Sequence, residues 1–267
     1  MSRLPHTPLP GAPMAAPVNA FKARLKAGEA LHGLWMSSAS PIAAEALGLL
    51  GFDWLLFDTE HTPVDAAGLQ PLLQAASAGP SALAARPAWN DKVLIKRFLD
   101  MGAQTLLIPF VETPDEAAAA VAACRYPPKG QRGVAGLTRA GRFGLAPDYL
   151  AQANEQICVL VQLETGGALA RLEAIAAVEG VDGVFIGPSD LAASMGHIGN
   201  PGHAEVQAAL QDAVRRLQAV GVPAGILASG AETAKRYLDW GYAFVAGAVD
   251  MALMINAARG LRAEMAG

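Results

Sequence analysis

Eight short apolar runs, separated by Ala- and Leu-rich stretches of helical length, constrain the fold of this 267-residue chain most strongly. The runs are apolar throughout rather than alternating, which is typical of parallel strands covered on both faces. We expect strands at residues 31–36, 52–58, 81–86, 104–110, 157–164, 182–190, 223–228 and 243–248. Eight such units in one chain favour a closed (β/α)8 barrel, which typically needs about 250 residues, over an open doubly wound sheet.

The two ends of the chain differ from this repeating pattern. Residues 1–17 hold five prolines and no apolar periodicity, so they predict a flexible tail ahead of a single barrel domain at 18–267. Residues 250–266 place apolar side chains at helical spacing along one stripe. Charged residues make up only 16% of the chain, against about 25% in typical proteins. We therefore expect a homo-oligomer assembled through the C-terminal helix.

Charge and hydropathy exclude several classes of partner. A net charge of -4 and a pI near 5.7 give no basic footprint for nucleic acid. No apolar stretch approaches the roughly 20 residues of a membrane span, and no basic-then-apolar leader opens the chain. We expect a cytoplasmic protein with no membrane partner. Cys124 and Cys158 lie in apolar segments, where a structural role is favoured over a reactive one.

Four of the apolar runs end in polar residues. The run ends are Asp58-Thr59-Glu60-His61, Arg86, Gln162-Leu163-Glu164 and Ser189-Asp190. Each residue by itself could be an ion-pair partner or a helix cap. Because a barrel carries its active site at the carboxyl ends of its strands, the four together favour a site on one rim.

Glu164 and Asp190 end the fifth and sixth runs, so they would converge from adjacent strands. Two carboxylates with open positions suit Mg²⁺ or Mn²⁺, although one of them could instead pair with Arg86. His61 is the one histidine that ends a run, with Asp58 three residues before it. Asp58 could accept a hydrogen bond from the imidazole and raise its basicity, or His61 could cap a helix. No lysine ends a run, so Schiff-base catalysis has no candidate residue.

Five motifs, in collinear order from about residue 20 onwards, make a family resemblance recognisable. They are "GFDWLLFDTEH", "RYPPKGQRG", "CVLVQLET", "EGVDGVFIGPSDLAASMGHIGNP" and "AKRYLDWGYAFVAGAVD". The chain resembles the HpcH/HpaI aldolases, which are class II pyruvate aldolases of the 4-hydroxy-2-oxoheptanedioate and 2-dehydro-3-deoxyglucarate type. Members of this family more often carry glycine where this chain has Thr59. A β-branched residue restricts the backbone there, which affects the placement of Glu60 and His61.

The resemblance implies a (β/α)8 barrel whose last helix is exchanged between subunits of a hexamer. It implies that Glu164 and Asp190 hold a divalent metal, either Mg²⁺, Mn²⁺ or Co²⁺. It further implies that Arg86 stabilises the developing enolate and that His61, with Asp58 as its partner, transfers the proton of the C4 hydroxyl. The residues expected to bind pyruvate are Arg86, Gln162, Ser189, Asp190 and Leu227.

The expected function is metal-dependent, reversible retro-aldol cleavage of 4-hydroxy-2-oxoacids to pyruvate and an aldehyde, in the breakdown of aromatic compounds or sugar acids. The alternatives are a 2-dehydro-3-deoxyglucarate aldolase, a citramalyl-CoA or malyl-CoA lyase, and a non-catalytic barrel scaffold. A CoA ester needs a basic surface, for which Arg125, Lys129 and Arg132 are the one candidate cluster.

Residues 136–144, "GLTRAGRFG", form a glycine-flanked loop that carries Arg139 and Arg142. We interpret it as a loop that moves over the mouth of the barrel and reads the distal carboxylate of an acidic aldehyde. The alternative is a solvated basic loop.

Overall fold

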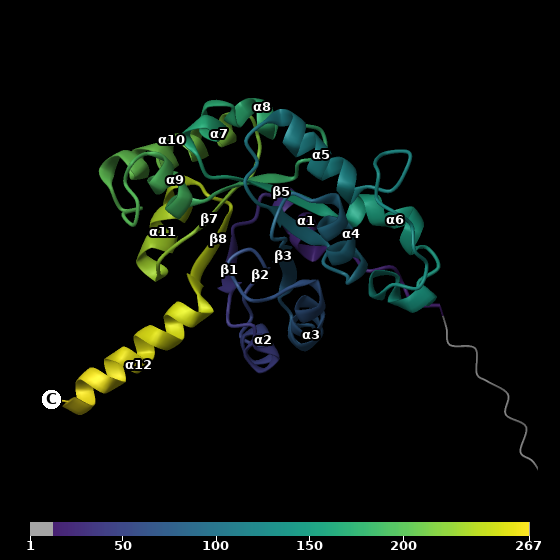
Figure 1. Ribbon diagram of the computed structural model, residues 1–267, viewed down its shortest axis with the longest axis horizontal. Helices are drawn as coiled ribbons and strands as arrows, with labels where there is room; N and C mark the ends of the chain where they lie inside the picture. Colours follow the sequence, from purple (N-terminus) through teal and green to yellow (C-terminus); the bar gives the residue numbers. More distant parts are fainter. Residues whose placement is uncertain (1–12, 267) are drawn as a thin grey trace, which may run out of the picture.

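The computed structural model describes residues 13–266, which form a closed barrel of eight parallel strands (Figure 1). Strand order around the barrel follows the chain, and β1 pairs with β8 to close it. The predicted (β/α)8 fold is therefore confirmed. The strands are β1 (Leu31–Met36), β2 (Trp54–Asp58), β3 (Ala82–Arg86), β4 (Thr105–Ile108), β5 (Cys158–Leu163), β6 (Gly183–Ile186), β7 (Ala224–Leu227) and β8 (Phe244–Val249).

Helices surround the barrel and pack apolar faces on the outer side of the strands (Figure 1). Their starts follow the sequence signals: Ser40 caps α2, and Thr113 with Glu116 forms a complete capping box on α5. The helices are α1 (Ala20–Lys26), α2 (Pro41–Gly48), α3 (Ala66–Ala76), α4 (Lys92–Asp100), α5 (Pro114–Cys124), the 3-10 helix η1 (Arg139–Gly144), α6 (Tyr149–Gln156), α7 (Gly166–Ala170), α8 (Leu172–Ala176), α9 (Pro188–Ser194), α10 (Ala204–Ala219), α11 (Ala231–Trp240) and α12 (Asp250–Ala266).

Aromatic rings fill the interior of the barrel. Phe21 of α1 contacts Trp54 and Phe244 edge to face, with ring centroids 5.8 and 5.7 Å apart. Helix α1 thus closes the amino-terminal end of the barrel. Cys124 and Cys158 are buried free thiols, as predicted; burial raises the pKa of Cys124 to about 12 and raises the pKa of Cys158 as well. The interior is a packed core, so a site can form only at an open end.

The sixth strand ends earlier than the sequence predicts. Strand β6 stops at Ile186, and α9 begins at Pro188. Proline suits the first helical position because it has no N–H to donate and its φ is already helical. Ser189 and Asp190 therefore lie in the first turn of α9, rather than on the strand.

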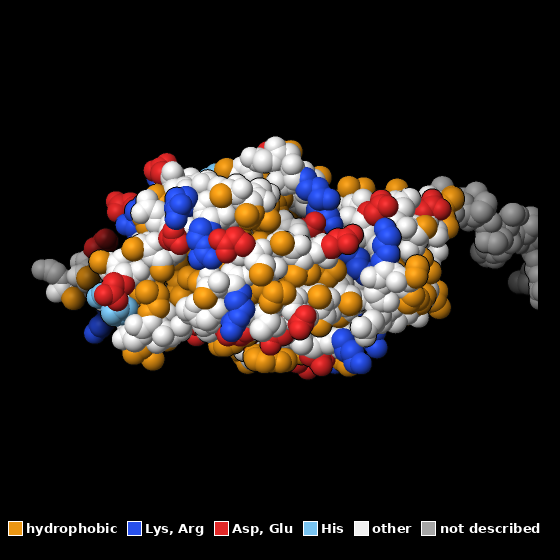
Figure 2. Space-filling view, turned by 90° about the horizontal axis from the view of Figure 1, so that it is seen from above, with side chains coloured by type: hydrophobic (Ala, Val, Ile, Leu, Met, Phe, Trp, Pro, Cys, Tyr) orange, Lys and Arg blue, Asp and Glu red, His pale blue; other side chains and the backbone are white. Residues whose placement is uncertain are grey.

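Helix α12 has the predicted bounds and extends away from the barrel (Figure 1). Its first residue, Asp250, is buried and accepts hydrogen bonds from Ser37 N, Ser37 Oγ and Ser38 N at 2.9, 2.9 and 3.2 Å. The rest of the helix is exposed or half-buried, including Leu253, Met254, Ile255, Leu261 and Met265. The described chain leaves the apolar stripe of α12 uncovered. Figure 2 shows another face, on which charged side chains stand in small groups between apolar ones.

The loop of Arg139 and Arg142 lies at the opposite end of the barrel from the one predicted. Arg139 donates to Met101 O at 2.7 Å and to Ser77 Oγ at 3.0 Å, so it reaches the loops that follow α4 and α3. The prediction of a lid over the active-site mouth is wrong for this subunit. The reason is topological: this loop runs from a helix back to a strand, and such connections lie at the amino ends of the strands.

Most of the predicted flexible tail, residues 1–12, lies outside the described residues. The part that follows is tied to the amino-terminal end of the barrel: Met14 N donates to Leu145 O at 2.8 Å, and Gln104 Nε2 donates to Pro17 O at 2.9 Å. Between residues 13 and 266, no helix is both long and apolar enough to cross a membrane.

Candidate active site

A hollow of about 260 Å³ opens at the carboxyl ends of the strands. It collects predicted residues from five separate segments, which is what the barrel topology requires of an active site. Those that line it are Asp58, His61, Arg86, Gln162, Ser189, Asp190 and Leu227. Glu164, the remaining predicted residue, is buried and accepts a hydrogen bond from Gln162.

Arg86 is the most firmly held side chain of the site. It ends β3 directly opposite Asp58 of β2 and donates to both oxygens of that carboxylate, each at 2.8 Å. Its guanidinium lies over the ring of Trp35, with Cζ 4.6 Å from the ring centroid. The paired carboxylate and the aromatic face fix a buried positive charge in one orientation.

Asp58 does not serve as the partner of His61, so that prediction is wrong. Burial works against its charge, but the hydrogen bonds from Arg86 outweigh burial and hold the pKa of Asp58 below its usual range. The His61 side chain is 65% exposed, and its Nε2 lies 3.9 Å from Glu60 Oε1. The register between β2 and β3 decides this, because it places Asp58 opposite Arg86, while His61 lies beyond the last paired residue of β2.

Glu60, one of the polar residues that end the second run, lies against Arg86, a contact that was not predicted. One of its oxygens, Oε2, lies 2.8 Å from Arg86 Nη1 but outside hydrogen-bonding geometry, and it is buried without a hydrogen-bond partner among the described residues. Burial raises the pKa of Glu60, and the charges of Asp58 and Asp190 add to the effect while Arg86 opposes it. Its place at the end of the second apolar run was the available signal. Trp35, near the end of the first run, was missed in the same way.

Glu164 lies at the centre of the acidic groups. Its Oε1 accepts from Phe110 N at 3.0 Å, and its Oε2 accepts from Gln162 Nε2 at 2.5 Å. Burial raises the pKa of Glu164 to about 7, and the nearby charges of Glu60 and Asp190 add to it. A Cβ on Gly187 would stand 2.6 Å from Glu164 Oε2, so only glycine leaves this oxygen its space.

The charges of the site do not balance. Glu60, Glu164 and Asp190 each carry an acidic group, whereas Arg86 is already paired with Asp58. The charge of Asp190 disfavours the ionised forms of Glu60 and Glu164, and hard oxygen donors in excess are what Mg²⁺ and Mn²⁺ bind. The residues present therefore fit a divalent cation.

Thr59 is accommodated without backbone strain. Its Oγ1 and its N both donate to Arg86 O, at 2.7 and 3.1 Å, so it ties the end of β2 to the end of β3. Its φ is not among the positive values found for non-glycine residues between 13 and 266. The β-branched residue therefore does not disturb this segment; its hydrogen bonds hold the chain in place just before Glu60 and His61.

A second group of metal-ligand types, His197, His203 and Glu205, lies between α9 and α10. The two imidazoles are stacked, with centroids 3.6 Å apart and planes at 16°, and His197 Nε2 lies 2.8 Å from Glu205 Oε2. Because the nitrogen lone pairs lie in nearly parallel ring planes, they do not converge on one point. This group is separate from the hollow at the strand ends.

This combination defines a (β/α)8-barrel protein with a carboxylate-rich site at the end where enzymes of the fold carry their active sites. The model of the HpcH/HpaI aldolase/citrate lyase family matches residues 31–257. The chain belongs to this family, which depends on divalent metals, and it is a carbon–carbon lyase of the class II pyruvate aldolase type.

Individual relatives agree with this assignment. A pyruvate aldolase from Rhizobium etli is 54% identical and covers 95% of this chain and 100% of the relative. A 4-hydroxy-2-oxo-heptane-1,7-dioate aldolase from Shigella sonnei is 52% identical, with 92% and 94% covered. The crystal structure of a family member from Burkholderia cenocepacia superimposes with a TM-score of 0.91 at 41% identity, covering 94% of this chain and all of that one.

Proposed function

We propose that the chain catalyses reversible cleavage of 4-hydroxy-2-oxoacids, such as 4-hydroxy-2-oxoheptanedioate, with a divalent cation held by Glu164 and Asp190. The observation that carries the proposal is the excess of negative charge beside a fixed arginine. Retro-aldol cleavage leaves the enolate of pyruvate, so negative charge grows on the C2 oxygen. When bound, Mg²⁺, Mn²⁺ or Co²⁺ supplies Lewis-acid stabilisation of that charge.

Arg86 provides the protein's own share of this stabilisation. Asp58 and Trp35 hold the guanidinium before substrate arrives, so no reorganisation is needed as charge develops. Arg86 lines the hollow, and its Nη1 donates to Gln162 Oε1 at 3.5 Å. Asp58 thus acts as a positioning residue rather than as the partner of the base.

His61 is proposed as the group that takes the proton of the C4 hydroxyl and returns it in the aldol direction. It lies at the exposed edge of the hollow, where the aldehyde half of the substrate would stand. The neighbouring carboxylate of Glu60, 3.9 Å away, would stabilise the protonated imidazole. Gln162, Ser189 and Leu227, which also line the hollow, would contact pyruvate.

We further propose a homo-oligomer, a hexamer, in which α12 packs on a neighbouring subunit. The support is the uncovered apolar stripe of α12, which the described chain does not bury. Apolar helices of this kind are stable in water when a partner covers them. Light scattering of the full chain at micromolar concentration tests this, and a monomer would contradict it.

The alternative of a CoA-ester lyase is less well supported. Two of the three residues of its basic cluster are buried in ion pairs, Arg125 with Asp182 at 3.8 Å and Arg132 with Asp100 at 2.7 Å. They are not available to a nucleotide. A 2-dehydro-3-deoxyglucarate substrate would use the same residues and differs only in its aldehyde half.

The experiment is an assay of pyruvate release from a panel of 4-hydroxy-2-oxoacids. Malyl-CoA and citramalyl-CoA are tested as further substrates, and their cleavage is followed by the release of acetyl-CoA. We expect cleavage of the free acids to stop on chelation and to return with Mg²⁺, Mn²⁺ or Co²⁺. Borohydride with pyruvate should trap no lysine adduct. A covalent pyruvyl-lysine, or turnover of CoA esters alone, would overturn the proposal.

A further inference from the structure

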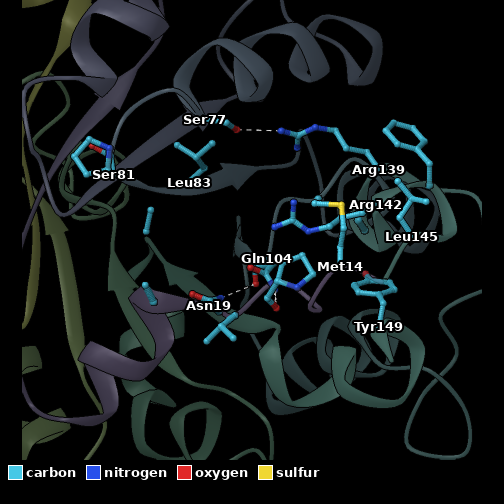
Figure 3. Close-up of a pocket in the computed structure, with 18 residues that line it drawn as sticks. Met14, Asn19, Ser77, Ser81, Leu83, Gln104, Arg139, Arg142, Leu145 and Tyr149 are labelled. Carbon is cyan, nitrogen blue, oxygen red and sulfur yellow. Dashed lines mark hydrogen bonds between the residues drawn. The ribbon is translucent and has the colours of Figure 1, made fainter. Parts of the chain in front are cut away.

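A second hollow, of about 670 Å³, lies at the amino ends of the strands, away from the candidate active site. We name it the basal pocket. Figure 3 shows Arg142 extending over its centre towards Gln104, while Arg139 runs along its edge to Ser77. Leu83, Leu145 and the ring of Tyr149 provide apolar surface.

The basal pocket carries positive charge without compensation. Arg139 and Arg142 line it, and no Asp or Glu is among its lining residues. Neither arginine makes an ion pair within residues 13–266, whereas Arg86, Arg132 and Arg216 all do. Burial lowers the pKa of Arg139, and the nearby charge of Arg142 lowers it further. Two like charges facing one hollow repel each other, and an anion between them would relieve this repulsion.

The backbone that carries Arg142 is held in an unusual conformation. Arg142 and Phe143 are consecutive left-handed residues, with φ of 51° and 56°. Non-glycine residues adopt this region at an energetic cost and do so mainly where the surroundings impose it, often at ligand sites. Here the two left-handed residues lie shortly after Arg139, whose side chain is held by a hydrogen bond to Met101 O.

We propose that the basal pocket binds a small organic dianion, whose charge contacts Arg139 and Arg142 and whose apolar part lies against Leu83 and Leu145. Paired guanidiniums suit carboxylates and phosphates because their donors match both oxygens. The volume falls in the range of small-molecule sites, about 300–1,000 Å³. A dicarboxylate and a phosphate monoester share this chemistry. The site is distinct from the proposed active site and does not depend on its assignment.

The test is calorimetric titration of the full chain with succinate and with phenyl phosphate, using uncharged succinamide as the control ligand. Saturating Mg²⁺ and pyruvate are present to occupy the opposite end of the barrel. The variants are Arg142→Gln, which breaks no ion pair or hydrogen bond of residues 13–266, and Arg139→Gln. Arg215→Gln, on the exposed face of α10, is the matched control.

We expect one dianion to bind per chain and succinamide not to bind. Arg142→Gln should weaken binding about 10- to 100-fold, as expected for one charge-assisted contact, and Arg215→Gln should not change it. The probe that binds with the higher affinity shows whether the ligand is a dicarboxylate or a phosphate monoester. Failure of both dianions to bind, or equal affinity in Arg142→Gln, would overturn the proposal. A change of oligomer mass in Arg142→Gln without dianion binding would assign the arginine to a subunit contact and also overturn it.

Discussion

The two ends of the barrel carry opposite charge imbalances. At the carboxyl ends, Arg86 is paired with Asp58, and the acids Glu60, Glu164 and Asp190 remain in excess. At the amino ends, Arg139 and Arg142 face a hollow that no acid lines. Charges that the chain does not balance itself point to what it binds, so the first end is suited to a cation and the second to an anion.

The largest expected effect concerns the acidic end. Glu164→Gln keeps the shape of the side chain but removes its charge, so it should abolish metal binding and slow cleavage about 1,000-fold or more. Metal titration and pyruvate release measure the two effects. Glu173→Gln, at a carboxylate paired with Arg216 on the outer surface, is the matched control and should change neither. Retention of the metal by Glu164→Gln would place the cation elsewhere.

Substitution of His61 tests proton transfer separately from the stabilisation of charge on the enolate. His61→Ala should slow aldol cleavage by about 100- to 10,000-fold, the usual loss of a general base, with little change in pyruvate affinity. Pyruvate has no C4 hydroxyl for His61 to serve. His203→Ala, in the loop before α10, is the control. Equal losses in pyruvate affinity and in turnover would make His61 a binding residue instead.

A stability comparison contrasts the two kinds of arginine directly. Arg86→Gln leaves the buried Asp58 carboxylate unpaired, which should cost about 3–5 kcal/mol in the free energy of unfolding. Arg142→Gln breaks no ion pair of the described residues, so its change should stay within about 0.5 kcal/mol. Urea unfolding of both variants measures this. Similar losses in the free energy of unfolding of the two variants would show that Arg86 and Arg142 are equally well paired, and would contradict the comparison.

The smallest expected effect is a pH dependence. The pKa of Glu164 is about 7 in the folded chain and 4.5 as an ordinary side chain. Between pH 4.5 and pH 7, the folded state therefore holds a proton on Glu164 that the unfolded state has lost. This group's contribution to the stability of the metal-free protein should therefore fall as pH rises from 4.5 to 7 and then stay level.

Mg²⁺ should reverse this trend, because it binds the ionised carboxylate, and its affinity should weaken below about pH 7. Thermal unfolding at about pH 6 and pH 8, with and without Mg²⁺, measures the effect. Glu164→Gln should remove the difference, and Glu173→Gln should keep it. A pH-independent response to Mg²⁺ would contradict the raised pKa.

The sequence by itself determined the barrel and the rim that bears the site. Apolar runs without alternation specify parallel strands buried on both faces, and strand ends in a closed parallel barrel meet at one rim. Asp58, Arg86, Gln162 and Asp190 could therefore be grouped from their positions alone, and all four line one hollow. The C-terminal helix was predictable for a similar reason, since its apolar spacing is local to the segment.

Only the tertiary structure decided which charges meet. The register of β2 against β3 pairs Asp58 with Arg86 rather than with His61. The fold also places Glu60 close enough to Glu164 for its charge to raise the pKa of Glu164, which burial already raises. The contact of Arg139 with Met101 O, and the hollow that Arg139 shares with Arg142, likewise depend on segments that meet only in the folded chain. Pairing of charges depends on distances between segments far apart in the chain, and local sequence patterns do not contain those distances.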